Sequence, residues 1–156
     1  MLIKDGSVWT WRATIRVNSF DLDGNLIDVV EFPNLITNVG KNLVRDSFDG
    51  GVTDLAIKYM GWGTSSTAPA AGQTTLVAES GRKAVTSQAD GAAGIIDTTV
   101  YLGPDDANVA IEELGWFSGS AASATADSGA MIARTLYSKN KTNLESVSVV
   151  RTDTWS

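Results

Sequence analysis

The residues best suited to catalysis are two pairs of adjacent carboxylates, because glycosidases use two acids held at a defined separation across a sugar. They are Glu112-Glu113 and Asp105-Asp106. Neighbouring residues on a strand point to opposite faces, so Glu112 and Glu113 cannot act together on one bond. We expect one of them to face the core and pair with a base, and the other to face solvent. Asp105-Asp106 follows a Gly-Pro dipeptide and is typical of a turn, so we expect no catalytic residue and no enzyme activity.

Three oxygen-bearing side chains alternate along the chain before residue 26. Asp21, Asp23 and Asn25 surround Gly24, as ligands do at the start of a calcium-binding loop. An EF-hand loop has its glycine at the sixth position and a glutamate at the twelfth, whereas here Gly24 is fourth counting from Asp21 and the twelfth residue is Phe32. The three residues are a calcium candidate, but a plain hairpin turn is favoured.

The sequence contains no cysteine and no histidine. Disulfides, thiolate nucleophiles, the usual zinc sites and the Ser-His-Asp arrangement are therefore excluded, and we expect no cofactor. The formal net charge is −6 and the 12 basic residues are scattered, which argues against a nucleic-acid partner. No apolar run is long enough to span a bilayer, and the first five residues lack the features of a signal peptide, so we expect neither membrane insertion nor export by that route.

Two arginines lie close to apolar residues and have two interpretations. Arg82 follows Glu79, and Arg134 stands between Ile132 and Leu136. An arginine in such a strand more often lies on the face that is exposed to solvent. The alternative is an Arg-carboxylate bridge at a strand end or subunit interface, because the planar guanidinium matches a carboxylate. Glu79, Glu112 and Glu113 are the carboxylates that could take part.

The chain has five tryptophans, and exposed tryptophans can stack on sugar rings. Trp9 and Trp11 share an alternating apolar face and are predicted to lie in the core. Trp62 and Trp116 adjoin glycines and two long loops; burial in the core or at a subunit contact is favoured over sugar stacking. Trp155 lies one residue from the last position and is predicted to anchor an interface.

The pattern along the chain predicts about eight strands and one helix. Alternation over 9–17 predicts a strand, Asp23-Gly24 a turn, and 26–32 a returning strand that Pro33 ends. Thr37 or Asn38 is expected to cap a helix that stops at 49–51. Its apolar face should hold Val39, Leu43, Val44 and Phe48. Further strands are expected at 55–62, 82–88, 94–102, 109–117, 129–137 and 144–154.

Two long connections, 63–75 and 118–128, are rich in Ser, Thr, Ala and Gly and contain only one charged residue, Asp127. Loops of this length are uncommon unless they bind or interact with something. A flexible tract is the equal alternative. Because tiny side chains let backbones lie close together, we expect these loops to form a contact surface between subunits.

Together these elements predict an all-β protein, an antiparallel jelly-roll-like β-sandwich of about eight strands with one short α-helix. The whole chain, 1–156, is expected to form a single domain. Within it, 1–33 forms either an N-terminal hairpin that completes the fold or an arm that reaches a neighbouring subunit.

Several segments resemble small structural proteins of tailed bacteriophages: NLITNVGKNL at 34–43, YMGWGTSSTAP at 59–69 and ESGRK at 79–83. IEELGWF at 111–117 and IARTL at 132–136 are similar to the same kind of protein. Such proteins are usually described as tail-fibre, baseplate or minor tail components. Jelly-roll proteins of this size also serve as head decoration or cement proteins, often as trimers. The resemblance implies an oligomeric β-sandwich, and it carries no catalytic or cofactor residue.

The favoured function is therefore that of a non-enzymatic structural protein of a phage virion, made in the host cytoplasm. Its partners would be copies of itself, with a trimer as the favoured stoichiometry, and other virion proteins. Trp62, Trp116, Arg82, Arg134 and Trp155 are the expected interface residues. The alternatives are a capsid decoration protein and a module that binds host surface glycans through Trp62 or Trp116.

Overall fold

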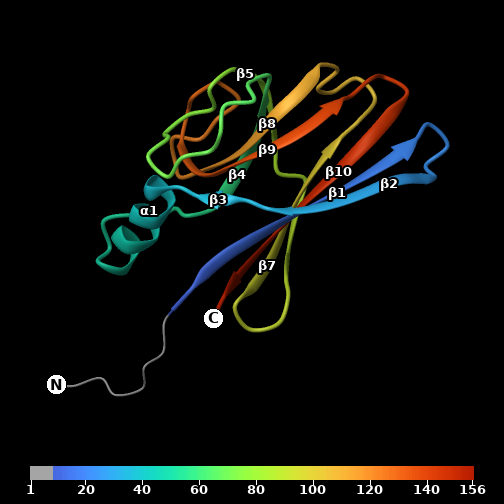
Figure 1. Ribbon diagram of the computed structural model, residues 1–156. Helices are drawn as coiled ribbons and strands as arrows, with labels where there is room; N and C mark the ends of the chain where they lie inside the picture. The colour runs from blue at the N-terminus through green and yellow to red at the C-terminus, as the bar shows by residue number, and fades with distance from the viewer. Residues whose placement is uncertain (1–8) are drawn as a thin grey trace.

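The computed structural model describes residues 9–156, which form ten strands and one helix (Figure 1). The strands make two five-stranded sheets in which every strand pair is antiparallel. The expected all-β antiparallel sandwich with one short helix is thus confirmed, while the jelly-roll connectivity stays a prediction. No helix within the described residues has the length and apolar character needed to cross a membrane.

The first sheet has the strand order β2-β1-β10-β7-β6. Its centre is the pairing of β1 with β10, which stay in register from Trp11 opposite Trp155 to Asp21 opposite Glu145. The N-terminal hairpin of β1 and β2 therefore completes this sheet within its own chain; residues 1–8 lie outside the described part. The bounds are Trp11–Asp21 for β1, Leu26–Pro33 for β2, Ser87–Asp90 for β6, Ile95–Leu102 for β7 and Glu145–Trp155 for β10.

The second sheet has the order β3-β9-β8-β4-β5. Most of β8 and the first half of β9 are buried, because one face meets the first sheet and the other is covered by loops; from Leu136 onward β9 is exposed or partly exposed. The bounds are Leu35–Ile36 for β3, Ile57–Gly63 for β4, Glu79–Ala84 for β5, Ala110–Ser118 for β8 and Ala130–Asn140 for β9.

The main core lies between the two sheets. The alternation in β1 is confirmed over its middle, where Ala13, Ile15 and Val17 are buried and the residues between them are exposed or partly exposed. Most other buried members come from the two sheets: Val100, Leu102, Val147 and Val149 from the first, and Met60, Trp62, Ile111, Leu114, Trp116, Ile132 and Ala133 from the second; Ala107 comes from the connection between β7 and β8.

The prediction that Trp9 and Trp11 lie in the core is wrong for Trp9, which is 58% exposed. The alternating pattern extends to Trp9, but the strand begins only at Trp11, so no sheet covers the earlier ring. Trp11 is half-buried and stacks on Trp155, with ring centroids 6.0 Å apart.

The single strand predicted at 82–88 is in fact two strands that belong to different sheets. β5 pairs with β4 in the second sheet, and β6 pairs with β7 in the first. The chain crosses between the sheets at two consecutive residues: the Val85 amide donates to Lys58 O (2.8 Å), and the Thr86 amide donates to Thr99 O (2.8 Å). This division and the two-residue strand β3 raise the number of strands from about eight to ten.

Helix α1 spans Asn38–Phe48 and packs against β9. Thr37 is its N-cap, as predicted: the hydroxyl accepts a hydrogen bond from Gly40 N (3.1 Å) and donates to Met131 O (2.6 Å). A Cβ at Gly40 would lie 2.6 Å from the Ile132 carbonyl oxygen, so the glycine allows the helix to approach the sheet closely. The expected stop is confirmed, with Asp49 as the C-cap.

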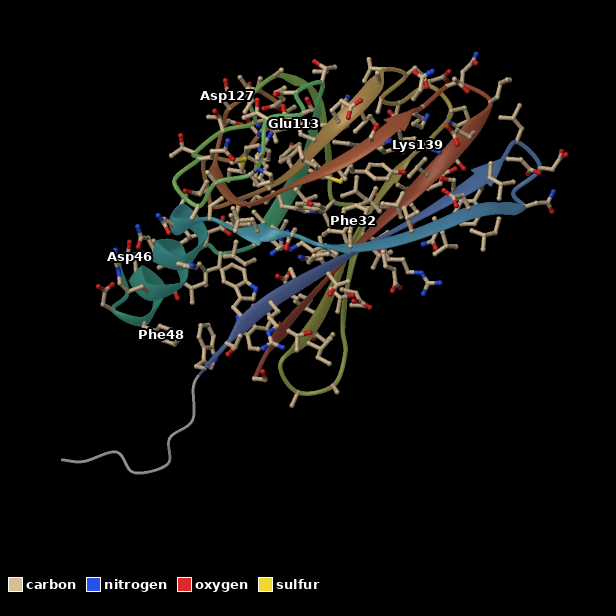
Figure 2. The ribbon with its side chains drawn as sticks, in the orientation of Figure 1. Phe32, Asp46, Phe48, Glu113, Asp127 and Lys139 are labelled. Atoms are coloured by element: carbon tan, nitrogen blue, oxygen red, sulfur yellow. The ribbon has the colours of Figure 1, made fainter. Side chains whose placement is uncertain are left out.

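The apolar face predicted for α1 is only partly correct. Val39, Leu43 and Val44 are half-buried, but the Phe48 side chain is 83% exposed. Figure 2 shows Phe48 at the outer end of the helix. The helix extends past the edge of the sandwich, so its last apolar residue has nothing of the same chain to cover it.

Candidate functional site

Two long loops cover the outer face of the second sheet, and we call them together the loop layer: residues 64–78, between β4 and β5, and 119–129, between β8 and β9 (Figure 1). Leu76 of the first loop and Ala122 of the second join a small apolar cluster with Phe117 and Met131 of the sheet. The cluster is separate from the main core. The sandwich thus carries a third layer made of loops.

A buried Glu113-Arg134 pair fixes the first loop to the sheet. Both side chains are 0% exposed. Glu113 accepts hydrogen bonds from Ala78 N (2.7 Å), Val77 N (3.1 Å) and Arg134 Nε (2.7 Å). Two of these donors are backbone amides of the loop, so the carboxylate ties the loop directly to β8 and β9.

Gly63 makes the space that the Glu113 carboxylate needs. A Cβ at this position would lie against Glu113 Oε1 and 2.5 Å from the Ala78 carbonyl oxygen. Arg134 extends the same network, since its Nη1 donates to Gln73 Oε1 (3.2 Å) of the loop. Glycine, acid and arginine therefore come from three neighbouring strands to hold one loop.

A second buried pair, Glu79-Arg82, fixes the other loop. Arg82 Nε and Nη2 donate to the two oxygens of Glu79 at 2.6 and 2.9 Å, and the side chains are 1% and 4% exposed. Arg82 Nη1 donates to the carbonyl oxygens of Ser123 (3.2 Å) and Ser128 (2.9 Å). The guanidinium also lies 3.9 Å from the centroid of the Phe117 ring. The pair closes the loop 119–129 over the sheet.

The solvated-face interpretation is therefore wrong for both arginines, and the bridge interpretation is confirmed with Glu79 and Glu113 as partners. The bridges form inside one chain. Because the side chains of Arg82 and Arg134 are enclosed, they cannot make the subunit contacts predicted for them. Glu112 points to the other face, is partly exposed and accepts a hydrogen bond from Ser138 Oγ (3.2 Å), as expected for the partner of a buried Glu113.

Trp62 and Trp116 are buried in the main core, at 8% and 0% exposure. Neither ring can stack on a sugar or touch a second subunit, which removes the glycan-binding alternative built on them. A Cβ at Gly81 would lie 2.7 Å from Trp62 Cζ2, so the neighbouring glycine makes room for the ring. Trp155 is partly exposed and remains a candidate interface residue.

The remaining acidic candidates are parts of turns. Asp21 accepts hydrogen bonds from Asp23 N (3.0 Å), Asn25 N (2.8 Å) and Asn25 Nδ2 (3.0 Å); these bonds, led by that of the Asn25 amide side chain, lower the pKa of Asp21. Within residues 9–156, no three His, Cys, Asp or Glu side chains gather so that they could hold a metal ion. Partial burial alone would raise the pKa of Asp106, but hydrogen bonds from Lys83 and Gly103 lower it overall.

The sequence reasoning missed a third buried pair, Arg151-Asp153. Arg151 Nε and Nη2 donate to the two Asp153 oxygens at 2.7 and 2.6 Å. Trp11 Nε1 donates to the same carboxylate at 2.7 Å, and the Asn34 amide, oriented to satisfy both of its ends, accepts from Arg151 Nη1 at 2.7 Å. The sequence contained a signal for this pair, because Arg151 and Asp153 are two residues apart and such residues on a strand point to the same face of the sheet.

A buried lysine, Lys141, was also missed. Its ammonium donates to Gly103 O (2.9 Å), Asn108 Oδ1 (3.2 Å) and Thr142 O (3.3 Å), and so closes the turn between β7 and β8. Burial lowers the pKa of this lysine. Nothing in the local sequence distinguishes it from an exposed lysine after a strand.

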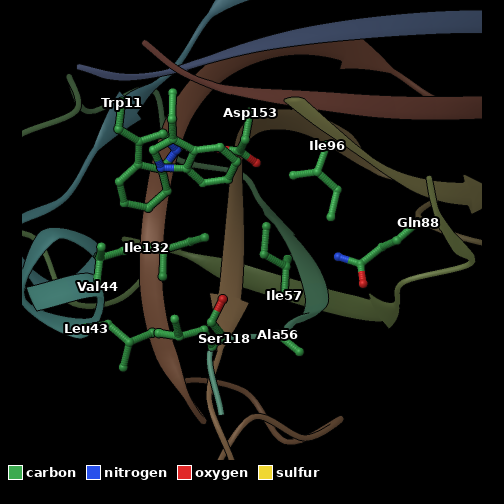
Figure 3. A pocket seen from close by; sticks show the side chains of 13 residues that line it. Trp11, Leu43, Val44, Ala56, Ile57, Gln88, Ile96, Ser118, Ile132 and Asp153 are labelled. Atoms are coloured by element: carbon green, nitrogen blue, oxygen red, sulfur yellow. The ribbon is translucent and has the colours of Figure 1, made fainter. Parts of the chain in front are cut away.

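Two apolar hollows lie beside α1. The first, of about 270 Å³, opens between the helix and the ends of both sheets; Trp11, Val44, Ile57 and Ile132 are among its walls (Figure 3). The second, of about 460 Å³, we call the helix groove. It is lined by Trp9, Trp11, Ile36, Lys41, Val44, Arg45 and Phe48.

The sequence matches no protein-family model and no curated protein, and no solved structure matches the chain. The resemblance to phage structural proteins therefore rests on the sequence segments that carry it.

Proposed function

We propose that this protein is a non-enzymatic structural component of a tailed-phage virion, in the tail fibre, the baseplate or another minor tail position. The loop layer is the observation that carries the proposal. Two buried Arg-Glu pairs hold two loops that are rich in small residues, and whose one charged residue is Asp127, in one arrangement over the second sheet. A buried ion pair adds little stability over an apolar pair, and its better-attested use is to specify one arrangement. A fixed surface is what a building block needs in order to pack against its neighbours.

The outward residues of the loop layer suit a protein contact. Those of the first loop include Thr64, Thr67 and Ala68, and those of the second include Ser120 and Ala121; all are small and uncharged. Side chains of this size lose little rotamer freedom on association, and they let a partner backbone lie close. The partners would be copies of this chain, for which a trimer remains the favoured stoichiometry, and other virion proteins.

Purified phage particles test the proposal. Mass spectrometry of particles from cells that produce this protein should detect it in stoichiometric amounts. A handful of copies per particle supports the tail placement, whereas the copy number of a capsid lattice supports the alternative, head decoration. Absence of the protein from particles refutes both placements.

Charged substitutions test the role of the loop layer. We expect Ala68→Arg and Ala121→Arg to reduce incorporation into particles, because each places a long charged side chain on the contact surface. Ala92→Arg is the matched control, since Ala92 is also exposed but lies in the turn between β6 and β7. Equal incorporation of all three variants would refute the role of the loops.

A further inference from the structure

The outer end of α1 presents an aromatic ring beside a hollow that would accept one. Phe48 is the most exposed of the large apolar residues that the structure describes, and it forms one wall of the helix groove. Trp9, another exposed ring, lines the same groove. A cavity of about 150 Å³ can hold benzene, so a groove of about 460 Å³ has ample room for a phenylalanine side chain. Exposed apolar side chains that gather around a groove are typical of a contact site.

Charges around the groove and around Phe48 are of opposite sign. Lys41 and Arg45 line the groove, and both are exposed. Arg45 forms an ion pair with Asp46 of its own helix at 2.6 Å, so Lys41 is the groove charge that a partner would meet. Phe48 is followed directly by Asp49 at the C-terminal end of the helix, where the helix dipole adds further negative charge. The groove thus suits an aromatic side chain next to a carboxylate, and the chain carries such a side chain on the same surface.

We propose that α1 of a second copy of this chain docks antiparallel on this surface, with Phe48 of each copy in the helix groove of the other. Asp49 of one copy then faces Lys41 of its partner. The contact is reciprocal, because the ring and the groove belong to one patch, and a self-complementary patch generates two-fold symmetry. The inference rests on the proposed function as an assembling protein and names one of its contact surfaces.

The surroundings of the groove extend the patch. Trp11 and Val44 line both the helix groove and the neighbouring hollow, and Trp155 lines that hollow together with them. This places Trp155 at the border of the contact, in keeping with the interface role predicted for it. A two-fold contact pairs copies, so a trimer would need the loop layer as a separate contact surface.

Light scattering coupled to size-exclusion chromatography tests the contact. The wild-type protein should have the mass of two chains, or of a multiple of two. Phe48→Ser should weaken self-association about tenfold or more, the loss expected when an interface anchor is truncated. Leu144→Ser is the matched control, because Leu144 is 66% exposed and lies far along the chain in the turn before β10. Both residues are exposed, and circular dichroism should show that both variants fold.

Charge exchange gives a second, independent readout. Lys41→Glu should weaken the pairing, and adding Asp49→Lys should restore part of it. Equal self-association of the Phe48→Ser and Leu144→Ser variants overturns the contact, as does a wild-type mass of one or three chains. A wild-type monomer that is nevertheless found in particles overturns the contact alone and leaves the proposed function standing. A Phe48-dependent dimer that is absent from particles supports the contact and refutes the proposed function.

Discussion

Removing Arg134 would leave a carboxylate buried without its cation, and the cost can be worked from the structure. Glu113 and Arg134 are both 0% exposed, and the Arg134 Nε lies 2.7 Å from Glu113 Oε2. Removing one partner of such a pair costs about 3–5 kcal/mol. Glu113 keeps its two backbone donors, Val77 N and Ala78 N, so we expect Arg134→Met to fall near the lower end, at about 3 kcal/mol. For a chain of 156 residues this corresponds to a melting temperature about 6–12 °C lower.

The double variant separates the buried charge from lost packing. Glu113→Gln combined with Arg134→Met removes both charges and retains one amide oxygen to accept from Ala78 N. We expect this variant to lose about 1–2 kcal/mol, less than Arg134→Met alone, because the charged hydrogen bonds are lost but no unpaired charge remains. The coupling energy between the two sites should therefore be about 2 kcal/mol or more.

Urea unfolding followed by the fluorescence of the buried tryptophans, Trp62 and Trp116, measures these differences. Arg16→Met is the matched control: Arg16 and Glu31 form an ion pair at 3.8 Å, but their side chains are 54% and 59% exposed, so the change should stay below about 0.5 kcal/mol. An Arg134→Met variant that unfolds at the same urea concentration as the Arg16→Met control would refute the reasoning. So would a double variant whose loss of stability equals the summed losses of Glu113→Gln and Arg134→Met.

Three further predictions concern the other loop, a glycine and a tyrosine. Arg82→Met should destabilise the protein by about 3 kcal/mol and speed amide hydrogen exchange in loop 119–129 more than in loop 64–78; equal exchange in both loops would contradict this. Gly63→Ala should lower the stability measured by thermal unfolding by about 1–3 kcal/mol, because the new Cβ would meet Glu113 and Ala78. Gly72→Ala should be nearly neutral, because no atom lies within 4 Å of a Cβ at that position. Similar losses in the two variants would contradict the claim that Gly63 is needed for lack of space. Burial, and to a lesser degree two nearby carboxylates, raise the pKa of Tyr137. The phenol therefore ionises at lower pH in the unfolded chain, and the free energy of unfolding should fall as pH rises above 10.0. Tyr137→Phe should reduce that fall, and an unchanged pH profile of stability would contradict the prediction.

The loop layer gives the buried charges of this protein a structural role. Glu79 and Glu113 resemble catalytic acids in being desolvated, but each accepts hydrogen bonds from an arginine and from the backbone of a loop: Glu113 from two amides and Glu79 from Asp127 N. A carboxylate engaged in this way inside the protein is poorly placed to exchange protons with a substrate. The same contacts explain why the loops can be long and rich in small residues while keeping a defined shape.

Local patterns determined the elements of this fold. The alternation around Ile15 and Val17 predicted β1, Asp23-Gly24 predicted its hairpin, and Thr37 or Asn38 was predicted to start α1; all three are confirmed, with Thr37 as the cap. These features depend on neighbours a few residues apart, so they can be recognised in the sequence itself. The opposite orientations of Glu112 and Glu113 followed from the same strand geometry.

The tertiary structure alone decided which surfaces are covered. Arg134 alternates with apolar residues as a solvated strand residue would, and only the return of loop 64–78 over the second sheet encloses it. Phe48 has the spacing of a core residue, yet the helix extends beyond the sheet and leaves the ring exposed. The sequence by itself determined most of the strands, the first hairpin turn and the helix, because these depend on local spacing. The short strand β3 and the division of 82–88 into β5 and β6 depended on which sheet each segment joins. The burial of residues such as Arg134 depends on segments far apart in the sequence meeting in space, as Arg134 meets Glu113 (21 residues away) and Gln73 (61 residues away).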